Sequence, residues 1–190
     1  MIYCGQPVKP KSSFKAFSAL LVFVLLFPYR TLAQPKSLLK SNITKDIYAY
    51  DGLDRYKRFL DSSLKESVRD KDKSIRKIYR EIVSSRHEGF LEELADSNFL
   101  FDNEVSVYLN KIFQHVVNTN QLNQYPFHFF VSRTSLSNAY CTEDGTIVCN
   151  LGLLDLLETE SQIALVFSHE IAHYLLKHPT QSLTSVLEKY

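Results

Sequence analysis

The sequence predicts a mainly helical α+β domain with a small antiparallel β-sheet or hairpin before its last helix. Apolar residues recur at helical spacing in two long stretches, and short aromatic and β-branched segments flank an Asp-Gly turn. The chain has 190 residues, of which 45% are hydrophobic and 23% charged. That length and composition fit one folded domain and exclude a mainly disordered or fibrous protein.

The first 33 residues have the layout of a secretory signal peptide. Three lysines precede an apolar run of 12 residues, 16–27, and Thr31-Leu32-Ala33 follows. A helix that crosses a bilayer needs about 20 apolar residues, so a cleaved signal is favoured over a membrane anchor. We therefore expect cleavage after Ala33, a periplasmic or secreted location, and no stable membrane insertion afterwards.

Charge excludes one large class of partners. The whole chain has 22 basic and 21 acidic residues, and the signal peptide carries four of the basic residues and none of the acidic ones. The mature chain therefore has a net charge of −3, which argues against a nucleic-acid partner or an anionic membrane bound through bulk charge.

The mature chain divides into three predicted regions. Residues 34–53 show no steady period and are expected to form an extended leader. Residues 54–100 form an N-terminal helical region, in which the apolar residues of 54–86 indicate one long helix or two helices broken near residues 70–72. We expect this region to pack on the domain as a solvated amphipathic helix rather than to serve as a dedicated partner-binding helix.

Residues 101–190 carry the rest of the predicted fold. Asp102 is the expected N-cap of a helix whose buried stripe includes Val105 and Leu109, and Thr159 begins a capping box for the last helix. The other expected elements are strands at 127–131, 138–142 and 146–150, a short helix at 153–157, and a last helix that runs to about Lys177 before Pro179.

Within that last helix lies the sequence His169-Glu170-Ile171-Ala172-His173. Two histidines four residues apart on a helix lie on one face, so both imidazoles can bind the same Zn²⁺ ion. Glu170 is then placed to act as the general base for a water molecule at that ion. The alternative, a pair of hydrogen-bonded core histidines, is less favoured because a buried apolar helix must find partners for all three polar side chains.

A catalytic zinc ion needs a third protein ligand. A longer motif with a third histidine is excluded, because Leu176 and Pro179 occupy the positions where it requires glycine and histidine. His178 is rotated by about 140° from His173 on a continuous helix and is expected to point away from the metal. Glu188 is the only acid downstream and is a possible ligand, but we favour a third ligand beyond Tyr190.

The segment from Asn138-Ala139-Tyr140 through Gly145 and Gly152-Leu153-Leu154 to His169–His173 resembles the HtpX-like and CAAX-prenyl-protease-like zinc metallopeptidases. The resemblance runs from about residue 102 to residue 178. It implies a zincin-like fold, two histidine ligands, a distant glutamate as the third ligand, and an endopeptidase that binds its substrate as an extended strand. The soluble exported members are the closer comparison. On this view 101–190 is the N-terminal part of the peptidase domain.

The hairpin before the zinc helix allows two further predictions. It provides either an edge strand for substrate or a purely structural hairpin. Cys141 and Cys149 lie four residues either side of Gly145, and in that register their Cβ atoms approach disulfide distance. A disulfide is favoured over metal ligation in an exported protein.

The sequence thus predicts a zinc-dependent metalloendopeptidase that hydrolyses peptide bonds of protein substrates outside the cytoplasm. The alternative is a truncated, non-catalytic binding or chaperone-like module that keeps the peptidase fold. The identity of the third ligand discriminates between the two.

Overall fold

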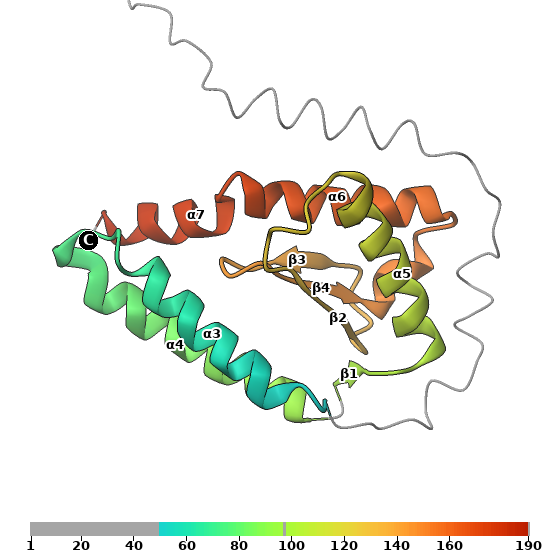
Figure 1. Cartoon of the computed structure of the whole chain (residues 1–190), viewed down its shortest axis with the longest axis horizontal. Coiled ribbons are helices and arrows are strands. Elements are labelled where there is room, and N and C mark those ends of the chain that lie inside the picture. Colours follow the sequence, from blue (N-terminus) through green and yellow to red (C-terminus); the bar gives the residue numbers. More distant parts are fainter. Residues whose placement is uncertain (1–49, 97, 190) are drawn as a thin grey trace, which may run out of the picture.

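The computed structural model describes residues 50–96 and 98–189, in which helices cover both faces of a four-stranded sheet (Figure 1). The α+β, mainly helical class predicted from the sequence is confirmed. The predicted signal peptide, 1–33, and the leader as far as residue 49 lie outside the described residues.

The N-terminal helical region is a pair of helices, α3 (Leu53–Ser67) and α4 (Lys73–Ala95). Of the two alternatives left open by the sequence, the structure thus has two helices broken near residues 70–72, and not one long helix. Asp72 ends the break as the N-cap of α4, because its carboxylate accepts a hydrogen bond from the backbone N–H of Ser74 at 3.0 Å.

A two-residue strand, β1 (Phe99–Leu100), leads into α5 (Glu104–Thr119). The prediction that Asp102 caps this helix is wrong. Asp102 has a φ of 52°, in the left-handed region, whereas an N-cap residue is extended. Asn103 takes that place, and its side chain and that of Ser106 form a reciprocal capping box.

The sheet has the strand order β1-β2-β4-β3. Its remaining strands are β2 (His128–Ser132), β3 (Ala139–Cys141) and β4 (Thr146–Asn150). The predicted hairpin is present, since β3 and β4 are antiparallel, but β4 pairs with β2 in parallel. The sheet is therefore mixed rather than wholly antiparallel, because β4 inserts between β2 and its own hairpin partner.

After β4 the chain forms a 3₁₀ helix, η1 (Leu151–Asp155), and then α6 (Glu160–Leu175). The predicted capping box at Thr159 is confirmed. The sequence did not predict α7 (His178–Leu187). Lys177 breaks the helical path with a φ of 58°, and Pro179 lies in the first turn of α7, where proline is favourable, instead of ending α6.

Two apolar layers hold the sheet between the helices. On one face, α3 and α4 pack on Phe130 and Val148; on the other, α5 and α6 pack on Val131 and Ile147. Successive side chains of a strand point to opposite faces of the sheet, so neighbouring residues of β2 and β4 belong to different layers. A third, smaller cluster joins Leu183 of α7 to Val68, Tyr79 and Val83 at the α3–α4 turn.

Candidate metallopeptidase site

Helix α6 places the predicted site residues. Ile163, Phe167 and Ile171 are fully buried against the sheet, which fixes the rotation of the helix. His169 and His173 consequently lie on the far side of α6 from this core face, His169 exposed and His173 half-buried. Both remain available to an ion from solvent.

The two histidines converge as the sequence predicts. Their Nε2 atoms are 3.0 Å apart, and the rings are nearly perpendicular, with centroids 4.5 Å apart. Two nitrogen ligands at about 2.0–2.1 Å from a tetrahedral Zn²⁺ ion are separated by about 3.4 Å. The pair therefore fits two ligand positions of such an ion with a small change in side-chain angle.

Within residues 50–96 and 98–189, no group of three or more His, Cys, Asp or Glu side chains is arranged to hold a metal. The structure does not bring Glu188, the candidate third ligand, to the histidine pair, since Glu188 caps the far end of α7. Ten helical residues span about 15 Å. Burial lowers the pKa of the Lys71 ammonium and the charge of Glu188 partly opposes that shift, while the ammonium donates a hydrogen bond to Thr184 at 2.9 Å.

The prediction that His178 points away from the histidine pair is wrong. Because the chain turns at Lys177, His178 begins α7, and its Nδ1 lies 2.7 Å from the Nδ1 of His173. One of these nitrogens donates and the other accepts. If His173 donates through Nδ1, its Nε2 carries the lone pair that accepts from Nε2 of His169, and this is the tautomer that a metal ligand needs.

Glu170 lies between this pair and the sheet. It is half-buried, and burial raises the pKa of Glu170 to about 7. Burial, and after it the charge of Glu170, raise the pKa of the Cys141 thiol, so Glu170 faces β3. A carboxyl group with a pKa near neutral can both take up and release a proton.

The predicted disulfide between Cys141 and Cys149 is wrong: both thiols are free. The register pairs Cys141 with Ile147 and Cys149 with Ala139, so the cysteines are diagonal neighbours rather than directly opposite. Diagonal neighbours are about 7–8 Å apart, beyond the Cα separation that a disulfide spans.

Strand β3 forms the outer edge of the sheet in the described part of the chain. Thr142 donates a backbone hydrogen bond to Thr146, and Asn150 donates one to Asn138. Because bonded residues alternate along an antiparallel pair, Tyr140 also faces β4, whereas the backbone groups of Ala139 and Cys141 face outward. The strand thus offers backbone groups to a further strand beside α6.

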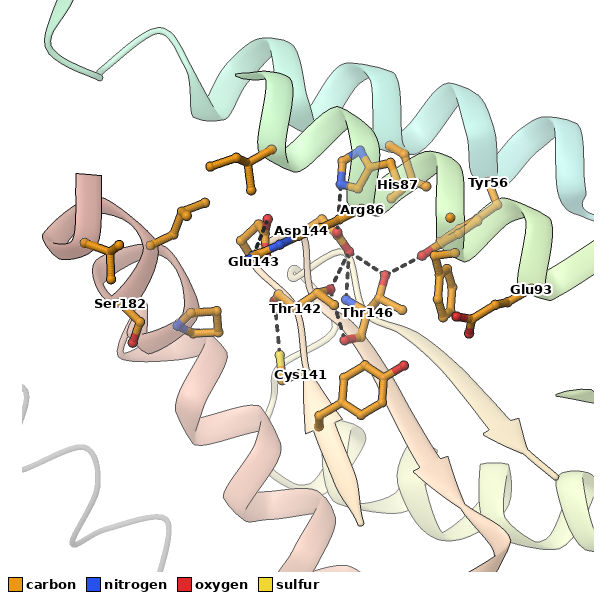
Figure 2. A pocket seen from close by; sticks show the side chains of 18 residues that line it. Tyr56, Arg86, His87, Glu93, Cys141, Thr142, Glu143, Asp144, Thr146 and Ser182 are labelled. Carbon is orange, nitrogen blue, oxygen red and sulfur yellow. Dashed lines mark hydrogen bonds and ion pairs between the residues drawn. The ribbon is translucent and has the colours of Figure 1, made fainter. Parts of the chain in front are cut away.

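A buried polar network that the sequence did not predict fixes the hairpin turn (Figure 2). Asp144, 4% exposed, accepts hydrogen bonds from the backbone N–H and the hydroxyl of Thr146 and from the hydroxyl of Thr142. Its other oxygen is 3.2 Å from Nε2 of His87 on α4, and Thr146 bonds to Tyr56 on α3 at 2.6 Å. The network ties both N-terminal helices to the hairpin. In the sequence, the Asp144-Gly145 pair indicates only a turn, and nothing there predicts that Asp144 also connects the hairpin to α3 and α4.

Two histidines and a glutamate on one helix, beside an open strand edge, are an arrangement typical of metallopeptidases. Comparison with known families agrees: residues 104–189, somewhat under half of the chain, match the model of peptidase family M48.

Among curated proteins, the chain is similar to the beta-barrel assembly-enhancing protease of Yersinia pestis, 26% identical over 89 residues, which are 47% of this chain and 18% of that protein. The protein of the same name from Escherichia coli K12 is 30% identical over 76 residues, 40% of this chain and 16% of that protein. The matched region is thus less than a fifth of these relatives. No solved structure matches significantly. No helix within residues 50–96 and 98–189 has the length and apolar character needed to cross a membrane.

Proposed function

We propose that this chain carries the core of a zinc metalloendopeptidase that hydrolyses peptide bonds of protein substrates. One observation carries the proposal: the Nε2 atoms of His169 and His173 converge to 3.0 Å, with Glu170 between them in sequence and a pKa near neutral. The match of residues 104–189 to peptidase family M48 supports it. The narrower resemblance to HtpX-like and CAAX-prenyl-protease-like enzymes, and to their soluble exported members, is part of this proposal.

His169 and His173 would hold the ion through Nε2, with the Nε2 lone pair of His173 favoured by its contact with His178. Zinc, when bound at such a site, polarises a carbonyl group and lowers the pKa of water. Glu170 takes a proton from the attacking water and passes it to the leaving amine. Its partial burial holds the carboxyl group ready for both transfers at neutral pH.

The substrate would lie along β3. The outward backbone groups of Ala139 and Cys141 can pair with an extended peptide, which brings its backbone past α6 and Glu170. A protein or peptide substrate in strand form is therefore the partner we propose, with no role for nucleic acid. The predicted signal peptide, 1–33, supports action in an exported, periplasmic or secreted setting.

The third ligand would be a glutamate outside residues 50–96 and 98–189, as the resemblance to the zinc metallopeptidases implies. The second candidate function is a non-catalytic binding or chaperone-like module with the peptidase fold, in which the open edge of β3 would be the binding surface. Hydrolysis separates the two candidates directly.

The test compares the wild-type chain with Glu170→Gln on an unfolded protein substrate in the presence of zinc. We expect the variant to bind zinc as the wild type does and to lose hydrolysis by at least a hundredfold, since general base catalysis contributes about 10²–10⁴-fold. Glu158→Gln, at an exposed acid outside α6, is the control. Equal turnover by Glu170→Gln refutes the mechanism, and absence of turnover by the wild type favours the binding module.

A further inference from the structure

A cavity of about 900 Å³ lies between α4, the β3–β4 hairpin and α7 (Figure 2). Its size lies within the range of sites that hold a ligand. The cavity is separate from the histidine pair, since His169 and His173 are not among the residues that line it. It shares Tyr140 and Cys141 with the strand edge described above.

Most of the cavity wall is apolar. Leu60 and Phe90 contribute from the N-terminal helices, and Leu183 and Val186 from α7. Val186 is 51% exposed, although it is a large aliphatic residue. Such a wall suits the aliphatic stem of a long side chain.

The hairpin turn gives the cavity an acidic end. The side chain of Glu143 is 7% exposed, and its Oε1 accepts no hydrogen bond from the described residues. The nearest cation, the Nη1 of Arg86, is 3.6 Å away, and the Arg86 side chain is 54% exposed. A buried carboxylate oxygen without a hydrogen-bond donor is unfavourable, so a donor that reaches it is strongly preferred.

The charges of the cavity do not balance. Glu93, Glu143 and Asp144 line it, against Arg86 and His87. His87 is already hydrogen-bonded to Asp144, and Arg86 is the one side chain paired with Glu143. Glu93 is exposed and lies on the β3 side, where its charge adds to the larger effect of burial in raising the pKa of Tyr140. An additional cation is therefore the complementary ligand.

The position of the cavity, beside β3, indicates that the cation would belong to a peptide paired with that strand. Side chains alternate between the two faces of a sheet, and Tyr140 packs on the α3–α4 face, where the cavity lies. A peptide strand paired with β3 would direct every second side chain to that same face. The other side chains would point toward α6 and the histidine pair.

We infer that this cavity binds a lysine or arginine side chain of an extended peptide that lies along β3. The apolar wall covers the stem, and the cationic end donates a hydrogen bond to Glu143. The inference rests on the proposed function for the strand edge, and it adds a substrate preference: a basic residue near the bond that is cut. Acidic side chains are disfavoured by the three carboxylates, and neutral ones leave the charge unbalanced.

The test measures binding rather than cleavage. The full chain carrying Glu170→Gln is titrated against fluorescent nine-residue peptides of Val, Thr and Ala with one central residue varied. Lysine is compared with norleucine, which has a similar stem without the charge, and with glutamate. We expect the lysine peptide to bind roughly tenfold more tightly than the norleucine peptide, and the glutamate peptide most weakly.

Glu143→Gln should abolish the preference for lysine, whereas Glu92→Gln, at an exposed acid of α4 that does not line the cavity, should leave it unchanged. Thermal unfolding of each variant checks that it is folded. Equal binding of lysine and norleucine peptides, absence of binding by all three, or a preference that survives in Glu143→Gln overturns the inference. If the wild type cleaves substrates without a preference for basic residues, the binding role of the cavity is refuted and the proposed peptidase function is not. If lysine peptides bind more tightly but no peptide is cleaved, the proposed peptidase function is refuted and the binding role of the cavity is not.

Discussion

Replacing Asp144 with alanine removes the acceptor at the centre of the buried hairpin network. Two donors lie 3.0 Å from its Oδ1, the backbone N–H of Thr146 and the hydroxyl of Thr142, and Nε2 of His87 lies 3.2 Å from its Oδ2. The same change breaks the connection to Tyr56, which reaches Asp144 through the hydroxyl of Thr146. We therefore expect the N-terminal helices and the hairpin to loosen together.

The size of the effect follows from these contacts. A hydrogen bond to a charged group contributes about 1.5–3 kcal/mol, and the substitution removes several such bonds and leaves their buried donors without an acceptor. The adjacent cavity lets water reach some of the freed donors, so the individual contributions do not add fully. We expect Asp144→Ala to lower the free energy of unfolding by about 3–5 kcal/mol, and Asp144→Asn, which keeps one acceptor, by less.

Urea unfolding at pH 7, followed by circular dichroism, measures the change, with Asp155→Ala at an exposed acid as the control. Burial alone would raise the pKa of Asp144, but hydrogen bonds from His87, Thr146 and Thr142 outweigh it and hold the pKa below its usual value of 3.8. The stabilisation is therefore present above pH 3.8 and is lost as the pH falls through the lower pKa of the folded state. A loss below 1 kcal/mol at pH 7 would refute the role assigned to the network.

Three further predictions concern the loop before α6 and the metal pair. Gly152→Ala should destabilise the fold by about 3 kcal/mol in thermal unfolding, because a Cβ atom there would overlap the carbonyl oxygen of Ser135; an unchanged melting temperature would contradict that packing. His178→Ala should weaken zinc binding by about tenfold or more, and His178→Asn should restore part of it, since an amide oxygen can accept the proton of His173; equal affinity in all three chains would exclude a positioning role. Because burial raises the pKa of Glu170 from 4.5 to about 7, the metal-free wild type should lose stability as the pH rises through that window, and Glu170→Gln should not; parallel pH profiles would contradict it.

Local patterns predict most of the secondary structure and the helix that carries the site. Thr159 and Gln162 mark the start of α6 because the capping box is contained within four residues. The hairpin at Gly145 is predicted equally well, since its turn has a φ of 92° that favours glycine. The parallel pairing of β2 with β4 depends instead on contacts between distant segments, which no local period encodes.

At the site, too, features set by neighbouring residues could be predicted from the sequence, whereas features set by contacts between distant segments could not. The spacing of His169 and His173 places them on one face of a helix, so their convergence follows from sequence. The position of His178 does not, because it depends on one left-handed residue, Lys177, that redirects the chain. The role of Asp144 as an anchor for α4 required His87, 57 residues away in sequence, to be placed beside it.

The account depends most on the claim that His169 and His173 together bind one metal ion. Calorimetric titration of the full chain with Zn²⁺, beside His169→Ala, His173→Ala and the control His115→Ala, tests it most directly. We expect one ion per wild-type chain, at least tenfold weaker binding in each variant of the pair, and unchanged binding in the control. Zinc affinity that is the same in the wild type and in His169→Ala would contradict the claim.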